Sequence, residues 1–102
     1  MKSKYLKMIK NLPQSNETDW SVYLLRCGDG TLYTGIAKDP LARFKKHQSG
    51  KGAAYTRTHL PIELIYQENA LSRSAALIRE AKIKKMPKAK KEFLVKSKKG
   101  ND

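Results

Sequence analysis

The sequence predicts a small α/β fold of the α+β kind, in which a three-stranded antiparallel sheet is flanked by helices. Three patterns indicate it: two apolar stretches joined by Gly28-Asp29-Gly30, a third, alternating stretch around Tyr66, and helical periodicity elsewhere. A chain of 102 residues has room for one modest hydrophobic core, so we expect one domain.

Residues 20–27 and 31–36 are expected to pair as a hairpin, and the length of the turn decides which side chains share a face. A two-residue Asp29-Gly30 loop would put Tyr23 and Tyr33 on opposite faces. We adopt instead a three-residue loop with Gly30 in the left-handed conformation. It pairs Cys27 with Thr31 and Arg26 with Leu32, and it places Tyr23, Tyr33 and Gly35 on one face and Val22, Leu24, Leu32 and Thr34 on the other.

A helix follows, with Asp39 as its N-cap and Pro40 as its first residue. It is expected to run to about Gln48, and Gly50 ends it. Helical spacing puts Leu41, Phe44 and Gln48 on the inner face, with Arg43 and His47 side by side on an adjacent face.

The middle of the chain is expected to be a basic loop, residues 50–61, which two glycines make mobile and which carries Lys51, Arg57 and His59. Residues 62–68 predict the third strand, because Ile62, Leu64 and Tyr66 alternate with polar residues. The last helix begins after Met86-Pro87 and is expected to bury Ala89, Phe93 and Leu94.

Ser72 caps another helix, and Glu80 falls in the middle of the apolar stripe formed by Ala76, Leu77, Ala81 and Ile83. A buried carboxylate without a partner costs several kcal/mol, so Glu80 must be paired, protonated or bound to a cation. An ion pair within this basic chain and a metal site both satisfy that requirement. On spacing alone the ion pair is favoured.

The chain holds 22 Lys and Arg residues against 9 Asp and Glu, a net charge of +13 that indicates a polyanion partner, nucleic acid first. No stretch of sequence approaches the roughly 20 apolar residues of a membrane span, and no signal-peptide pattern opens the chain. The lone Cys27 excludes an internal disulfide and a zinc finger, and it fits a reducing compartment. Residues 1–19 are expected as an N-terminal extension, weakly helical or disordered, 20–95 as the folded domain and 96–102 as a frayed basic tail.

Several of these residues occur in a recognisable order: Ser21-Val22-Tyr23, then Tyr33-Thr34-Gly35, the helical Arg43 and the later helical Glu80. This order resembles the GIY-YIG nuclease superfamily. Four residues after the arginine, where the family carries Tyr or His, this chain has His47. The runs 50–57 and 83–86 resemble its small standalone branch, related to YhbQ-type and SLX1-type nuclease domains, and the resemblance spans residues 20–95.

The chain departs from the family at three places. The first motif lacks the family's Gly and Ile. Ile36 stands where DNA-repair members carry a Lys, for which Lys38 could substitute, and Glu92 stands where those members carry an Asn. These departures concern the rate and the substrate more than the fold.

The resemblance implies a catalytic set composed of Tyr23, Tyr33, Arg43, His47 and Glu80, with one Mg²⁺ or Mn²⁺ on Glu80. Tyr23 would act as the base or would position the attacking water. His47 would be a second proton carrier, and Arg43 would bind the scissile phosphate. Gly35, Lys38, Lys51 and Arg57 are expected to contact nucleic acid, with Gly35 leaving room for a phosphate. Without the resemblance, cross-strand packing would explain the two tyrosines, and a surface position would explain Arg43 and His47.

We therefore expect a cytoplasmic, monomeric, metal-dependent endonuclease that cuts DNA, branched or damaged DNA included, in repair or recombination. Cleavage of RNA stays open. Two other classes also stay open: a nucleic-acid-binding module without catalysis, and a nuclease subunit that needs a protein partner.

Overall fold

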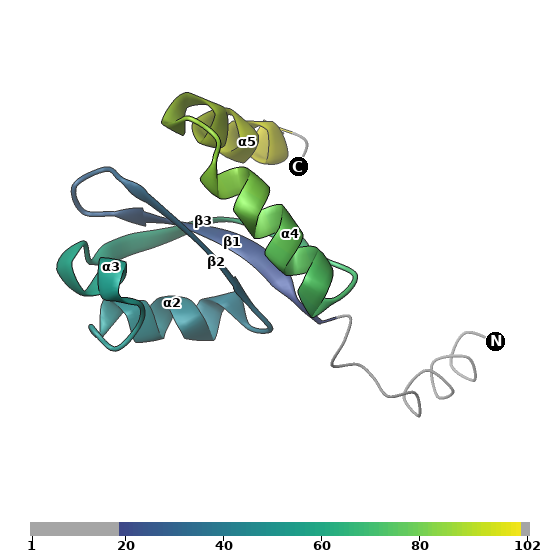
Figure 1. Cartoon of the computed structure of the whole chain (residues 1–102). Coiled ribbons are helices and arrows are strands. Elements are labelled where there is room, and N and C mark those ends of the chain that lie inside the picture. The colour runs from purple at the N-terminus through teal and green to yellow at the C-terminus, as the bar shows by residue number, and fades with distance from the viewer. Residues whose placement is uncertain (1–18, 101–102) are drawn as a thin grey trace.

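The computed structural model describes residues 19–100, and the sheet within them has the strand order β2-β1-β3 with both pairs antiparallel. Its strands are β1 (Ser21–Cys27), β2 (Leu32–Ala37) and β3 (Pro61–Asn69). Helices α2 (Pro40–Gln48) and α3 (Ala54–Thr58) lie on one side of the sheet, and α4 (Arg73–Lys84) and α5 (Lys88–Gly100) lie on the other (Figure 1). The predicted fold class is confirmed.

Predictions were made for both ends of the chain, and the described residues include more of the C-terminal end than of the N-terminal end. The expected N-terminal extension, residues 1–19, lies outside the described residues apart from Asp19. Residues 96–100, expected in a frayed tail, continue α5 as a helix. No helix among residues 19–100 combines the length and apolar character that a membrane span requires.

The hairpin has the predicted three-residue turn. Gly30 has φ 87°, and the Cys27 N–H donates to the Thr31 carbonyl at 2.9 Å. The register pairs Arg26 with Leu32 and Tyr23 with Gly35. Tyr23 and Tyr33 therefore share one face of the sheet, as the choice of turn required.

Each face of the sheet has its own apolar cluster. On the side of α2, Tyr23 and Leu25 of β1 pack with Ala37, Tyr33, Phe44 and Leu64. On the side of α4 and α5, Val22 and Leu24 pack with Tyr66, Ala76, Ile83 and Val95. The central strand β1 supplies both clusters because its successive side chains point to opposite faces.

The third strand forms as predicted, but Ile62, Leu64 and Tyr66 do not share one face of the sheet. The register of β3 against β1 shifts twice, so that Leu25 pairs with Leu64 but Leu24 pairs with Tyr66. These irregularities put Leu64 in one apolar cluster and Tyr66 in the other, and they leave Ile62 59% exposed. An extra residue in one strand switches the face of every residue beyond it, and periodicity alone does not reveal it.

The predicted inner faces of the helices also need correction. In α2 the buried residues are Pro40 and His47, whereas Leu41 is 52% exposed and Gln48 is exposed. The basic loop, expected to be mobile, contains α3. In α4 the buried stripe is Ala76 and Ile83, with Leu77 and Ala81 exposed, and in α5 Val95 is buried while Ala89 and Phe93 are exposed.

Candidate active site

Two buried polar side chains meet on the α2 side of the sheet. Tyr23 comes from β1 and is 1% exposed, and His47 comes from the last turn of α2 and is fully buried. The Tyr23 hydroxyl lies 2.9 Å from Nε2 of His47. Helical spacing had placed His47 beside Arg43 on a flank of the helix, and the structure places it in the interior instead.

The segment that follows α2 encloses the His47 ring. Gly50, with φ 82°, turns the chain back, and Thr56 of α3, also fully buried, brings its hydroxyl 2.7 Å from Nδ1 of His47. A Cβ at Gly52 would lie 2.1 Å from that same Nδ1. Glycine at position 52 therefore allows the backbone to pass against the imidazole.

The hydrogen bonds assign the tautomer of His47. The Thr56 hydroxyl donates its single hydrogen to the Ala53 carbonyl at 2.9 Å, so it accepts from Nδ1, and Nε2 is left to accept from the Tyr23 hydroxyl. The Ala53 N–H, 3.4 Å from Nδ1, would favour the other tautomer, but this contact is long and the shorter bonds decide. Burial, and after it the charge of Arg43, lowers the pKa of His47 below 6.5, so the ring is neutral near pH 7.

The surroundings of Tyr23 oppose its ionisation. Burial above all, with smaller contributions from Tyr33 and Glu80, raises the pKa of Tyr23 to about 12. Arg43 acts in the opposite sense, because its guanidinium hydrogen-bonds and attracts the phenolate. Tyr23 therefore keeps its proton at neutral pH, and its hydroxyl donates a hydrogen bond to Nε2 of His47.

Tyr33 adjoins the buried pair and connects it to the surface. Its ring centroid lies 5.0 Å from that of His47 and 6.4 Å from that of Tyr23. Tyr55 stacks on Tyr33 at 6.2 Å, and His59 stacks on Tyr55 at 4.0 Å. The row of rings therefore reaches the surface at Tyr55 and His59, where the Tyr55 hydroxyl donates to the Thr31 hydroxyl at 2.8 Å.

Gly35 was expected to leave room for a phosphate, but the ring of Tyr23 takes that room. A Cβ at position 35 would lie 2.6 Å from the Tyr23 hydroxyl oxygen and 3.1 Å from the Tyr33 ring. Glycine is thus required so that the Tyr23 phenol can cross the neighbouring strand and reach His47. The role of Gly35 in this geometry is to position Tyr23.

Glu80 belongs to α4, which packs against the face of the sheet opposite α2 and contacts both β1 and β2. Its side chain is 16% exposed and forms an ion pair with Lys84, one turn along the same helix, at 3.3 Å. Its charge still acts on Tyr23, whose pKa it raises. The expected ion pair within the chain is therefore present, and the charge of the carboxylate also influences Tyr23.

Glu80 by itself could offer a divalent cation one carboxylate ligand. Among the described residues, no three His, Cys, Asp or Glu side chains gather in a way that could hold a metal ion. A mostly buried carboxylate whose charge acts at the Tyr23 hydroxyl suits one hard-oxygen ligand of Mg²⁺ or Mn²⁺, with the remaining positions left to water and phosphate.

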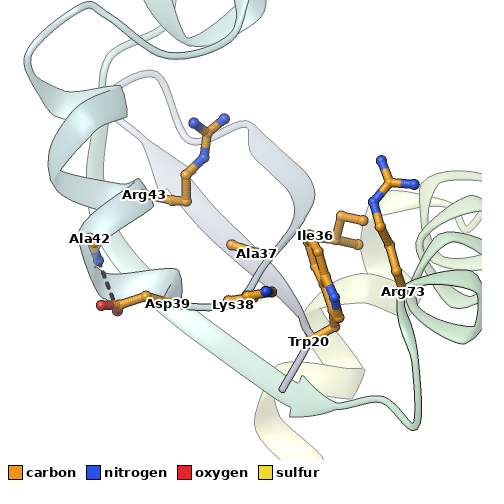
Figure 2. A pocket seen from close by; sticks show the side chains of 8 residues that line it. All are labelled: Trp20, Ile36, Ala37, Lys38, Asp39, Ala42, Arg43 and Arg73. Atoms are coloured by element: carbon orange, nitrogen blue, oxygen red, sulfur yellow. Dashed lines mark hydrogen bonds between the residues drawn. The ribbon is translucent and has the colours of Figure 1, made fainter. Parts of the chain in front are cut away.

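Lys38 and Arg43 line one pocket, together with Trp20 and Arg73 (Figure 2). Lys38 follows β2 directly, and its ammonium lies 5.6 Å from the centre of the Trp20 ring. Lys38 thus shares a pocket with the arginine expected to bind phosphate. The other two expected nucleic-acid contacts, Lys51 and Arg57, are exposed on the segment that encloses His47.

Glu92, which stands where related repair enzymes carry an Asn, has a structural partner. Its carboxylate accepts two hydrogen bonds from the guanidinium of Arg26 at 2.8 and 2.9 Å, and Lys88 lies 3.1 Å away. The Arg26 bonds lower the pKa of Glu92 to about 2. This pair fixes α5 to the hairpin.

Sequence reasoning missed Gly52, Thr56 and Trp20 as site residues. Gly52 and Thr56 belong to the run 50–57, in which only Lys51 and Arg57 were expected to have a role, because only the fold shows that this run encloses His47. Trp20, expected as the first residue of the strand 20–27, directly precedes β1 in the structure. A signal was available, since Trp20 is the single tryptophan in a chain of strong positive charge.

Comparisons with known proteins agree with this arrangement. Residues 19–92 match the model of the GIY-YIG catalytic domain. A UPF0213 protein of Streptococcus sanguinis (strain SK36) is 50% identical over 80 residues, which cover 78% of this chain and 92% of that protein. The UPF0213 protein SERP0126 of Staphylococcus epidermidis is 56% identical over 63 residues, which cover 62% of this chain and 77% of that protein.

One solved structure supports the fold as well. The solution NMR structure of the UPF0213 protein BH0048 from Bacillus halodurans matches with a TM-score of 0.50 and 43% sequence identity, over 78% of this chain and 84% of that one. A domain match across most of the chain, relatives of similar length and a shared fold agree with one another. The chain therefore belongs to the GIY-YIG family, alongside the UPF0213 proteins.

Proposed function

We propose that this chain is a metal-dependent endonuclease that hydrolyses phosphodiester bonds of DNA. The observation that carries the proposal is the hydrogen bond from the Tyr23 hydroxyl to the neutral Nε2 of His47. A phenol whose pKa is about 12 is a poor base by itself, and a buried imidazole that accepts its proton removes that difficulty.

The pair can act as a proton relay. As water attacks phosphorus, the water proton passes to the Tyr23 oxygen while the Tyr23 proton passes to Nε2 of His47. The new oxygen–phosphorus bond forms, and the leaving oxygen keeps the electron pair of the broken bond and takes a proton from solvent. The His47 imidazolium then returns its proton to solvent. A phosphate bound beside the pair favours the protonated imidazole by its negative charge.

Arg43, and a metal ion held by Glu80, would stabilise the negative charge at phosphorus. Arg43 can fork onto two phosphate oxygens and stabilise the charge that grows there. Glu80 would hold Mg²⁺ or Mn²⁺, which supplies charge neutralisation at the phosphate when bound. Lys38, Lys51 and Arg57 would anchor the flanking backbone without reading its sequence.

A second candidate function is nucleic-acid binding without catalysis. One observation favours it: the Glu80 carboxylate already has a partner in Lys84, at 3.3 Å, so a metal ion has to compete with that ammonium. A nuclease subunit that depends on a protein partner would give the same experimental result, because the isolated chain would bind DNA without cutting it. The cytoplasm and a monomeric state fit both candidates.

The test is cleavage of labelled single-stranded, duplex and branched DNA by the full chain with Mg²⁺, Mn²⁺ or EDTA. We expect cutting with either metal and none with EDTA. Glu80→Gln keeps the shape of the side chain and should abolish cutting while DNA binding in EDTA stays similar. The matched control is Glu63→Gln, which removes the same charge from an exposed carboxylate of β3.

Two results would contradict the proposal, the first for the activity and the second for the site. One is DNA binding by wild type without metal-dependent cutting of any structure, which would leave the binding module or the partner-dependent subunit. The other is Glu80→Gln cutting as fast as Glu63→Gln, which would remove Glu80 from the site.

A further inference from the structure

We propose that Trp20, Lys38 and Arg73 form a subsite for one unpaired nucleotide, so that the preferred substrate has an unstacked base beside the bond to be cut. The proposal deepens the proposed function and rests on it for the position of the cut. Stacking of a base on Trp20 does not itself require catalysis.

The subsite is a pocket of about 490 Å³ between the start of β1, the end of β2 and the first turn of α2. This volume lies within the ~300–1,000 Å³ typical of small-ligand sites. Figure 2 shows the Trp20 indole on one side and Arg43 on the other, with Ala37 and Lys38 between them. A planar group in the pocket would therefore meet an aromatic ring on one side and a guanidinium on the other.

Part of the Trp20 ring is left free to stack on a base. The indole packs, as Ile36 does, against the apolar cluster that contains Val22, yet it stays partly exposed. The ammonium of Lys38 and the guanidinium of Arg73 lie 5.6 and 5.5 Å from the ring centre, near the ~6 Å limit for cation–π attraction. Both cationic side chains are exposed to solvent, so their cation–π attraction to the indole is weak.

The charge of the pocket suits a phosphate next to the base. Lys38, Arg43 and Arg73 line it, against the single carboxylate of Asp39. That carboxylate is engaged at the start of α2, where it accepts from the Ala42 N–H at 3.2 Å (Figure 2). A nucleobase that replaces the Lys38 ammonium on the indole would release that charge to bind the adjoining phosphate.

An unpaired nucleotide fits this chemistry better than a duplex does. Bases inside a duplex are stacked on one another, and their faces are closed to a protein ring. A free base can stack on an aromatic side chain whatever its identity, at a gain of about 10-fold or more in affinity per base. Arg43 belongs both to this pocket and to the site of Tyr23 and His47, which places the unpaired nucleotide beside the scissile phosphate.

The experiment uses the emission of Trp20, the single tryptophan of the chain. The full chain is titrated in EDTA, so that nothing is cut, with three DNA probes that have equal numbers of phosphates. They are a single-stranded oligothymidylate, a closed hairpin duplex and an abasic single strand. We expect strong quenching by the oligothymidylate and little by the other two.

Variants test the same subsite by affinity. Trp20→Ala should weaken single-strand binding by about 10-fold and change duplex binding little. Trp20→Phe keeps a ring for the packing and for the base, and it should retain most of the affinity, which matters if the alanine variant fails to fold. Lys38→Ala should cost more single-strand affinity than Lys90→Ala, a matched loss of charge on the exposed side of α5.

The outcomes separate this proposal from the proposed function. Equal quenching by the abasic strand would identify a phosphate site without base stacking and overturn the subsite. Cutting of DNA without selective quenching would overturn the subsite and leave the nuclease. Selective quenching by a chain that cuts nothing would support the subsite and reject the nuclease.

Discussion

The hydroxyl of Tyr23 lies 2.9 Å from Nε2 of His47, and neither side chain is more than 1% exposed. A buried phenol and a neutral imidazole at this distance form a path for one proton. The same contact holds the end of α2 against the central strand of the sheet. The pair therefore joins the chemistry of the site to the packing of the domain.

The relay predicts that both partners are needed for cutting. Tyr23→Phe keeps the ring and removes the proton carrier, and His47→Gln keeps a polar group and removes the base. Each should lower the cleavage rate by about 10²-fold or more, the range of general acid–base catalysis. The rate is measured under single-turnover conditions on the best substrate, with folding checked by circular dichroism.

The control for the relay is His59→Gln. His59 stacks on Tyr55 at the outer end of the ring row, so its loss should change the rate little. A His47→Gln variant that cuts as fast as His59→Gln would show that Tyr23 works without the imidazole.

The titration of His47 follows from its environment. Burial and Arg43 lower its pKa below 6.5, so the unfolded chain binds a proton at a higher pH than the folded one. The contribution of His47 to stability is then complete above pH 6.5 and declines as pH falls from there through the folded pKa. The chain has 2 histidines, so His59→Gln leaves His47 as the single imidazole for an NMR titration.

Arg43 should influence that titration. Arg43→Ala removes the neighbouring positive charge and should raise the pKa of His47 part of the way toward its ordinary value. An unchanged His47 titration in that variant would mean that burial alone sets the value.

Gly52 should tolerate no side chain. The Cβ of Gly52→Ala would fall 2.1 Å from Nδ1 of His47, which forces the ring or the backbone to move. We expect a loss of about 1–3 kcal/mol in the free energy of unfolding, the usual range for overpacking. Gly28→Ala is the matched control, because its Cβ would meet nothing closer than 3.8 Å. Equal loss in the two variants, measured by urea denaturation, would contradict the close fit around His47.

Arg43 should contribute to the rate more than to affinity. A guanidinium that stabilises charge at phosphorus predicts a fall of ~10²-fold or more in turnover for Arg43→Ala, with partial rescue by Arg43→Lys, which lacks the fork. Lys51→Ala, at an exposed loop cation, should affect binding only. Equal, affinity-level losses at Arg43 and Lys51 would remove Arg43 from the catalytic set.

The ion pair of Arg26 and Glu92 predicts an acid-labile contribution to stability. The pKa of Glu92 falls from 4.5 to about 2 on folding, so the stabilisation is complete above pH 4.5 and disappears as pH falls toward 2. The side chains are about one third exposed, which limits the effect to ~1 kcal/mol. Glu92→Gln should be less stable than wild type at pH 7 and equal to it near pH 2, as followed by thermal unfolding. A gap that persists at pH 2 would show that the charge is not responsible.

The parts of the site that the sequence could predict are those that depend on local geometry. The three-residue turn was enough to place Tyr23 and Tyr33 on one face, because side chains alternate strictly along a hairpin. The burial of His47 rather than Leu41 depends on the rotation of α2, which contacts with Thr56 and Gly52 determine. Those contacts come from the segment that follows α2, which a pattern along α2 itself does not contain.

The buried faces of α5 and β3 could not be predicted from the sequence, for related reasons. Phe93 is the largest apolar residue of α5, yet Arg26 holds Glu92 against the hairpin, and Val95 rather than Phe93 turns to the core. In β3 the two register shifts interrupt the alternation on which the prediction relied. Pairwise contacts between elements overrode the hydrophobic pattern in both cases.

The position of Tyr23 on the central strand has a consequence for motion. β1 is hydrogen-bonded to β2 on one edge and to β3 on the other, so the Tyr23 amide should exchange its hydrogen only when most of the domain opens. Thr56 lies on a helix of 5 residues that two glycines precede, and its amide should exchange through smaller, more frequent openings. Such openings would break the bond between Thr56 and His47 while Tyr23 stays in place, so the imidazole would be the part of the relay that is free to rearrange.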